Sequence, residues 1–259
     1  LMGRMPCSHP KHDRWINALN KCVSIIQRSQ NTDGSVQGDG WAGVLQSSFA
    51  ASALESAKFQ GAQVNDSALR KAQDFQKANF DVSSGSAVTE RAAGITLYAV
   101  SGSTRNSARE AREVKDVMEK AKKDGKVAEA APVSVDALED AGYTRTDAER
   151  LNTAYQVYNS AKVQAQADNV VSGFGNNGGE EFLSFLQTGE SLVIGKDNGW
   201  RNWYQQTTSR LVGIQNNDGS WNGHHCITSP VFCTATCLLI LSIHKDMQFS
   251  MKQHQNGNN

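Results

Sequence analysis

One six-residue turn sequence occurs twice in this chain, once near each end. Residues 30 to 35 read QNTDGS and residues 215 to 220 read QNNDGS, so the two copies begin 185 positions apart. Asn, Asp, Gly and Ser are the residues that end helices and form tight turns. Internal repetition indicates a repeat architecture, and for a period of about 45 residues, typical of helix pairs, this separation is about four periods. We therefore expect about four helix pairs.

The second copy belongs to one complete repeat unit, residues 211 to 243, which reads as a helix end, a turn, a short loop and an apolar helix. Trp221 follows the turn directly, and a large aromatic residue there can cover the end of the preceding helix. We expect Trp221 to be structural, and the Gln215 amide to bond free N–H groups at the start of the next helix. The matching motif residues are Gln30, Asp33 and Gly34 in the first copy and Gln215, Asp218 and Gly219 in the second.

Helical periodicity in the rest of the chain completes the predicted pairs. The expected outer helices span residues 13–29, 68–80, 147–167 and 200–214. The second helix of each pair is richer in apolar or small residues, which predicts an inner ring at 44–57, 88–100, 181–193 and 231–243. Residues 106–123 alternate in charge at helical spacing, which favours a solvated outer helix.

These helices predict an all-α fold and one domain. A chain of 259 residues, 39% of them hydrophobic, can bury a full core. Residues 1–12 form an extended lead-in, residues 13–245 the domain, and residues 246–259 a polar tail. Repeats that bury their apolar faces against neighbours point to an α/α toroid, either closed or incomplete.

The charge balance and the apolar runs exclude two classes of function. Lys plus Arg and Asp plus Glu both number 26, so no bulk charge favours nucleic acid or an anionic membrane. The longest apolar run, around residues 237–241, is shorter than the roughly 20 residues of a membrane-spanning helix. The chain begins with Leu and lacks a signal peptide, so we interpret it as a processed product or part of something longer. We expect a soluble protein, and the sequence leaves open whether it is cytoplasmic or exported after processing.

The five cysteines leave redox pairing open. They are too few and odd in number for a disulfide framework. They lie at Cys7, Cys22, Cys226, Cys233 and Cys237.

The turn and its Trp carry a family resemblance. Residues 215–221, and less completely residues 30–35, resemble the QW-type repeats of squalene-hopene cyclases and the repeats of protein prenyltransferase β subunits. The chain looks most like bacterial proteins of unassigned role described as prenyltransferase/squalene-oxidase repeat proteins. The segments NGGEEFLSFL and QNNDGSWNGHHCITSPVFCTATCLLIL are the most similar. The resemblance implies the α/α toroid for the whole chain.

The catalytic motifs of that family are missing or altered. The DxDD motif with which the cyclases protonate their substrate does not occur. The resemblance aligns Glu180 with the zinc-binding Asp of the prenyltransferases, Phe182 with their Cys and Cys233 with their His. One ligand is thus absent and another has changed type, so the family's zinc site is broken.

A cluster of His, Cys and Glu residues can be interpreted as a rearranged zinc site or as purely structural. His224, His225, Cys226 and Cys233 lie within ten residues, and Glu180 is expected at the same rim of the toroid, where loops precede the inner helices. The alternatives are a polar loop for the histidines, and inert buried thiols or one disulfide for the cysteines. We predict no cofactor, with zinc as the alternative.

The adjacent carboxyl groups of Glu180 and Glu181 also allow two interpretations. Two carboxyl groups at a cavity mouth can act as a general acid and base. Neighbouring residues on a helix point about 100° apart, however, so they do not face each other. We favour a role in the first helical turn, where negative charge suits the helix dipole.

Without the family's catalytic motifs, we expect a non-catalytic binding or scaffold module that uses the central funnel or its rim. Its partner would be a protein, a peptide or an apolar small molecule. The alternative is a cyclase-like or prenyltransferase-like enzyme with a rearranged metal or acid site. Aromatic residues make up only 7% of the chain, whereas cyclases stabilise carbocations with many aromatic faces.

Overall fold

The structure is a computed structural model that describes residues 11–36 and 43–255, with side chains up to residue 245. It is 66% helical, and the strands in these ranges form a single two-stranded hairpin. The predicted all-α class is confirmed.

The elements follow the chain as helix pairs joined by turns. The helices are α1 (His12–Arg28), α2 (Gly43–Phe59), α3 (Asp66–Lys77), η2 (Glu90–Ala92), α4 (Thr96–Lys123), α5 (Val135–Asp140), α6 (Arg145–Gln164), α7 (Asp168–Val171), α8 (Glu180–Ile194), α9 (Trp200–Gly213) and α10 (Pro230–Gln255). The hairpin pairs β1 (Phe80–Asp81) with β2 (Ser86–Ala87) in antiparallel register. Side-chain oxygens of Asn65, Ser134 and Thr144 accept backbone N–H bonds at the starts of α3, α5 and α6.

Helix α4 differs from the prediction. The expected inner helix 88–100 and outer helix 106–123 are the two parts of one helix, which begins only at Thr96 because the hairpin and η2 occupy residues 80–92. Ala93 and Gly94 precede it in the left-handed region, with φ of 52° and 79°.

The charged face expected for residues 106–123 is solvated, with the Asp116, Glu119 and Lys123 side chains 55%, 67% and 73% exposed, but the opposite face of the helix belongs to the core. Ala108, Ala111 and Val114 are fully buried there, whereas Val231 and Leu238 on α10 are 81% and 55% exposed. The buried face also includes one of the charged residues, Glu110, which forms ion pairs with Lys77 and Arg150 inside the protein.

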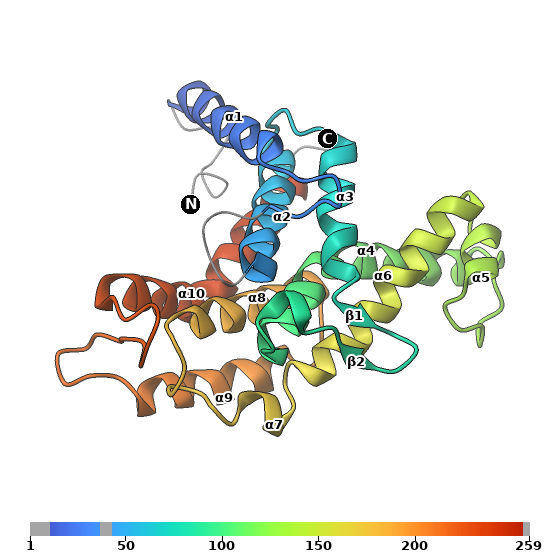
Figure 1. Ribbon diagram of the computed structural model, residues 1–259. Coiled ribbons are helices and arrows are strands. Elements are labelled where there is room, and N and C mark those ends of the chain that lie inside the picture. The colour runs from blue at the N-terminus through green and yellow to red at the C-terminus, as the bar shows by residue number, and fades with distance from the viewer. Residues whose placement is uncertain (1–10, 37–42, 256–259) are drawn as a thin grey trace.

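Helix α4 joins three groups of helices. It packs against α2 and α3, against α5 and α6, and against α8. Figure 1 shows α1 to α3 on one side of it and α8 to α10 on the other, with α5 beyond its far end. The largest apolar core of the described residues lies mainly among α4, α8, α9 and α10 and also takes in Val44 of α2 and Phe75 of α3. Smaller cores lie between α4, α5 and α6 and among α1, α2 and α3.

The repeated turn folds in the same way in both copies. One carboxylate oxygen of Asp33 accepts bonds from the backbone N and hydroxyl of Ser35, at 3.0 and 2.7 Å, and Asp218 does the same with Ser220. These bonds hold the pKa of each Asp below its ordinary value. Gly34 and Gly219 supply φ of 91° and 84°.

The two Gln residues of the turn contribute differently from the expectation. The side-chain amide of Gln215 donates to the carbonyl of Gly219 at 2.8 Å, inside its own turn. Gln30 donates in the same way to Gly34, and also to the carbonyl of Ala68 in α3 at 2.9 Å. Neither amide bonds N–H groups of the following helix in these contacts, so the predicted capping role is wrong.

Trp221 lies against the end of α9. It is 4% exposed, and its indole N–H donates to the carbonyl of Leu211 at 2.8 Å. Its backbone N–H bonds the hydroxyl of Thr234, so the same residue joins α9 to the start of α10. This is a helix-end contact of the kind the sequence suggested.

Three predictions concern the lead-in, the end of the last helix and the closure of the ring. The lead-in lies outside the described residues up to residue 10, and the helical backbone of α10 continues to Gln255, beyond the predicted 243. In the described ranges, α10 packs on α8 and makes no comparable contact with α2, so a closed ring is not seen. No described helix is long and apolar enough to cross a membrane.

Candidate functional site at the start of helix α8

Two segments that are far apart in the sequence meet at the start of α8. The backbone N–H of Gly179 donates to the carbonyl of Ile227 at 2.8 Å, and that of His224 donates to Asn177 at 2.9 Å. A Cβ on Gly223 would lie 2.3 Å from the nitrogen of Gly179, so this approach requires glycine. The loop before α8 and the loop before α10 therefore form one surface, beside the start of α4.

Glu181 fastens the first of these loops. It is fully buried, and its two carboxylate oxygens accept bonds from the backbone N of Gly175 at 2.9 Å and the side-chain amide of Asn177 at 3.0 Å. Burial raises the pKa of Glu181, and the two hydrogen bonds oppose that shift without cancelling it. Glu181 thus orders residues 175–177 rather than facing Glu180 as an acid/base couple.

Glu180 is buried and is not held by the loop in this way. It is 3% exposed, and neither carboxyl oxygen pairs with a Lys, Arg or His among the described residues. The carboxyl group lies so close to Gly178 that a Cβ there would be 2.3 Å from one of its oxygens. A buried carboxyl group without a cationic partner is costly when it is ionised.

Two proton-bearing groups lie beside Glu180. Burial, and then the charges of Glu180 and Glu181, raise the pKa of the Tyr98 hydroxyl at the start of α4. Loss of solvent, and then the charge of Glu180, raise the pKa of the Cys226 thiol. A hydrogen bond to Glu180 contributes to both shifts, so the Tyr98 hydroxyl and the Cys226 thiol are neutral donors beside its carboxyl group.

The thiols of this region are free and protonated. Burial raises the pKa of Cys233, and it raises the pKa of Cys237 to about 12. Cys226 is exposed and has a left-handed φ of 53°, which is uncommon for a residue with a side chain. Because the thiolate is the reactive form, none of these three cysteines has the character of a nucleophile. Cys226 and Cys233 form no disulfide.

The histidines lie at the surface of the same loop. His224 and His225 are exposed, their rings meet edge to face, and their Nδ1 atoms are 3.4 Å apart. Among the described residues, no three His, Cys, Asp or Glu side chains are placed to share a metal ion. The zinc candidates Glu180, His224, His225, Cys226 and Cys233 thus lie in one region without converging on one point.

The sequence analysis missed a second buried charged cluster. Arg105 in α4 lies 2.8 Å from Glu55 of α2 and 2.9 Å from Glu190 of α8, and Arg109 reaches the other oxygen of Glu55 at 3.3 Å. Burial alone would raise the pKa of Glu55, but the two arginines outweigh it and lower that pKa. A lone Arg within the small-residue run YAVSGSTRNSA was the available signal.

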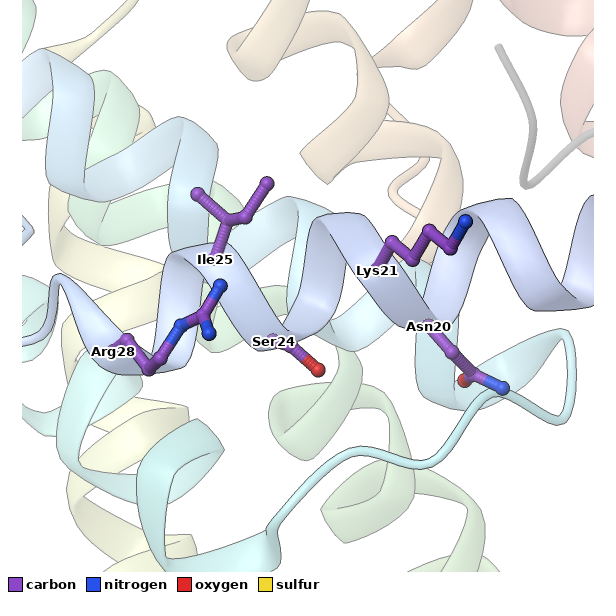
Figure 2. Close-up of a pocket in the computed structure, with 5 residues that line it drawn as sticks. All are labelled: Asn20, Lys21, Ser24, Ile25 and Arg28. Carbon is purple, nitrogen blue, oxygen red and sulfur yellow. The ribbon is translucent and has the colours of Figure 1, made fainter.

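An open groove of about 470 Å³ lies elsewhere, on α1. Figure 2 shows that its lining comes from successive turns of this single helix, and the lining residues are Asn20, Lys21, Ser24, Ile25 and Arg28. Its lining contains no buried carboxyl group, unlike the region around Glu180. We therefore assign the candidate site to the start of α8 and not to this groove.

Comparison with known proteins gives no relative from which to transfer a function. No family model, no curated protein and no solved structure matches this chain.

Proposed function

We propose that this protein is a non-catalytic binding module whose ligand site is the start of α8, at the surface formed with the loop before α10. The observation that carries the proposal is Glu180, which is 3% exposed and forms no ion pair with the described residues. Costly buried polar groups persist where function requires them. A ligand that brings positive charge to Glu180 would supply what the described residues do not.

The surrounding groups support binding rather than group transfer. Both oxygens of Glu181 are engaged by the loop before α8, so it is not placed as a second acid or base. The raised pKa values of Cys226 and Cys233 keep these thiols protonated. The exposed His224 and His225 lie at the rim, where a peptide can reach them. A protein or peptide partner therefore suits the site.

We further propose that the helix pairs form an arc of an α/α toroid that presents this rim. The pairs are α1 with α2, α3 with α4, α6 with α8, and α9 with α10. The matching hydrogen bonds of the turns at Asp33 and Asp218 support a common repeat unit. The resemblance to prenyltransferase/squalene-oxidase repeats supports the same arrangement. Cross-linking distances between α2 and α10 that are incompatible with an arc would contradict it.

Panning a displayed random peptide library on the whole protein tests the binding function. We expect peptides that bind the wild type saturably by fluorescence anisotropy, and that lose affinity for Glu180→Gln. Glu129→Gln, at an exposed position on the loop after α4, is the matched control and should bind like the wild type.

The state of the recovered peptides separates binding from catalysis. Mass spectrometry should return each selected peptide unchanged after prolonged incubation with the protein. Cleavage or modification that depends on Glu180 would establish the enzyme alternative instead. Failure to select any peptide sensitive to Glu180→Gln would overturn the proposed peptide-binding site.

A further inference from the structure

We propose that the outward face of α1 is a docking surface for an acidic amphipathic helix of a partner protein. This surface goes beyond the proposed function, because it lies on α1 and not at the start of α8. Three features of α1 support it: the rows of side chains that form its groove, the charge that they carry, and the attachment of the helix to the rest of the protein.

The groove on α1 lies between two parallel rows of side chains. One row contains Lys21 and Ile25, and the other contains Asn20, Ser24 and Arg28, so neighbours within each row are four residues apart. Rows with this spacing are the ridges of an α-helix, and a second helix packs by placing a ridge of its own into the groove between them. The shape of the groove therefore favours a helix as its occupant.

The groove faces away from the core that anchors α1. The buried side of α1 consists of Val23 with the partly buried Leu19 and Ile26, which pack against residues of α2 and α3. Ile25 is 57% exposed, and Figure 2 shows it between Lys21 and Arg28 along the helix. A docked helix can bury the exposed part of Ile25, so the surface offers an apolar contact at its centre.

The same face of α1 carries positive charge. Arg14, Lys21 and Arg28 are spaced by seven residues, which is close to two helical turns, so they lie on one line along the helix. All three are exposed, and none forms an ion pair with another described residue. Asp13 is the only acidic residue of α1. Because the whole chain has no net charge, this positive charge is local, and it selects carboxylate groups on the partner.

Hydrogen bonds to the loop before α3 hold this surface in shape. The side-chain oxygen of Asn20 accepts the backbone N–H of Gln63 at 2.8 Å, and that of Gln27 accepts the backbone N–H of Asn65 at 2.8 Å. A surface that is already ordered loses little conformational freedom on binding. Because one helix face makes a small interface, we expect a Kd on the order of micromolar.

Two other anionic partners match this surface less well. Nucleic acid strands bind through phosphate contacts and through bases stacked on aromatic side chains, whereas the groove is lined by aliphatic, polar and cationic residues. Anionic membranes attract clusters of about four to eight Lys and Arg residues. The line on α1 contains only Arg14, Lys21 and Arg28. An acidic helix uses both this charge and the apolar contact at Ile25.

A selection of helical peptides on the whole protein tests the proposal. The displayed library holds amphipathic helices of one frame, with glutamates beside the apolar stripe in half of the members and lysines there in the other half. The wild type should enrich the glutamate members. Fluorescence anisotropy should show that these peptides bind at least about tenfold more weakly to the double variant Lys21→Glu with Arg28→Glu. That variant should enrich the lysine members instead.

Two further variants serve as a control and as a test of the apolar contact. Lys120→Glu with Lys126→Glu makes the same change in net charge at exposed positions in and just after α4, and should bind the glutamate peptides like the wild type. Ile25→Ser should weaken their binding about tenfold, because the aliphatic contact is lost. All these positions are exposed, so circular dichroism and thermal unfolding should match the wild type.

Several outcomes would overturn the proposal. Enrichment of lysine members or of no helix on the wild type would do so, as would equal affinity of the glutamate peptides for the wild type and the Lys21→Glu with Arg28→Glu variant. Tighter binding of a mixed-sequence single-stranded oligonucleotide, or of phosphatidylserine vesicles, than of the selected peptides would assign the face to another class of partner. Peptides that depend on Glu180 should bind this variant unchanged, so the two surfaces succeed or fail separately.

Discussion

The two ends of helix α8 place acidic side chains in opposite situations. Near its C-terminal end, Glu190 binds Arg105 at 2.9 Å, and the same arginine binds Glu55 at 2.8 Å. At its start, Glu180 is just as deeply enclosed as Glu55 and forms no ion pair with the described residues. One helix thus carries a partly buried acid paired with arginine and a buried acid without a cationic partner.

The difference separates structure from function along α8. The Arg105 cluster ties α2, α4 and α8 together with groups supplied entirely by the chain. Removing one partner from such a cluster leaves an uncompensated buried charge, which is strongly destabilising. Glu180 takes part in no such cluster, so its replacement should affect a ligand and leave the fold intact. Mutations at the two ends of α8 test this difference.

The largest expected effect is at Arg105. Arg105→Met should lower the free energy of unfolding by about 3–5 kcal/mol, because Glu55 and Glu190 lose their shared partner. Denaturant titration followed by circular dichroism measures it.

Arg109→Met is the matched control. The Arg109 side chain is 43% exposed, although it also pairs with Glu55, so its loss should cost less than about 1 kcal/mol. Equal losses for both variants would show that the buried cluster does not hold the three helices together.

Helix positions could be predicted from the sequence because they depend on local periodicity and turn residues. The helix predicted at residues 13–29 corresponds to α1 at His12–Arg28, and the helix predicted at residues 200–214 corresponds to α9 at Trp200–Gly213. The two segments around Glu180 and Cys226 could also be placed together, because repeat units bring loops to the same end.

The partners of buried charges could not be predicted in this way. Arg105 and Glu55 are 50 positions apart, and nothing in the local pattern pairs them. The interface of α2, α4 and α8 is also polar, with the Ser48 hydroxyl bound by Asn106 at 3.0 Å and Gln187 at 2.6 Å. We expected the inner helices to pack through apolar or small residues, and that pattern does not indicate hydrogen bonds between them.

A smaller effect is expected at Glu181. Glu181→Ala removes the acceptors of the Gly175 N–H and the Asn177 amide, and should lower the free energy of unfolding by about 1–3 kcal/mol. Hydrogen exchange should accelerate at the Gly175 amide, and Glu180→Gln should leave that rate unchanged. If both variants changed it alike, the division of roles between the two glutamates would be wrong.

The pH dependence of stability should differ in sign between Glu55 and Glu181. The pKa of Glu55 is below its ordinary value of 4.5, so its contribution is present above pH 4.5 and is lost as the pH falls further. The pKa of Glu181 is above 4.5, so its contribution is present below that pH and is lost as the pH rises through the folded-state pKa.

Paired variants measure these two signs. From pH 3 to pH 7, the stability difference between wild type and Glu55→Gln should grow, and that between wild type and Glu181→Gln should shrink. Other carboxyl groups titrate in both members of each pair and cancel. Parallel slopes for the two pairs would contradict the assigned directions.

The smallest expected effect on stability is at Glu180. Glu180→Gln replaces a buried carboxyl group that has no ion-pair partner among the described residues, so the free energy of unfolding should stay the same or rise by up to about 1 kcal/mol. Denaturant titration of the ligand-free protein provides the measurement. A loss above about 1 kcal/mol would mean that Glu180 stabilises the fold as Glu55 does, and the two ends of α8 would then be alike. An unchanged fold together with weakened binding is the combination that only a ligand-directed carboxylate produces.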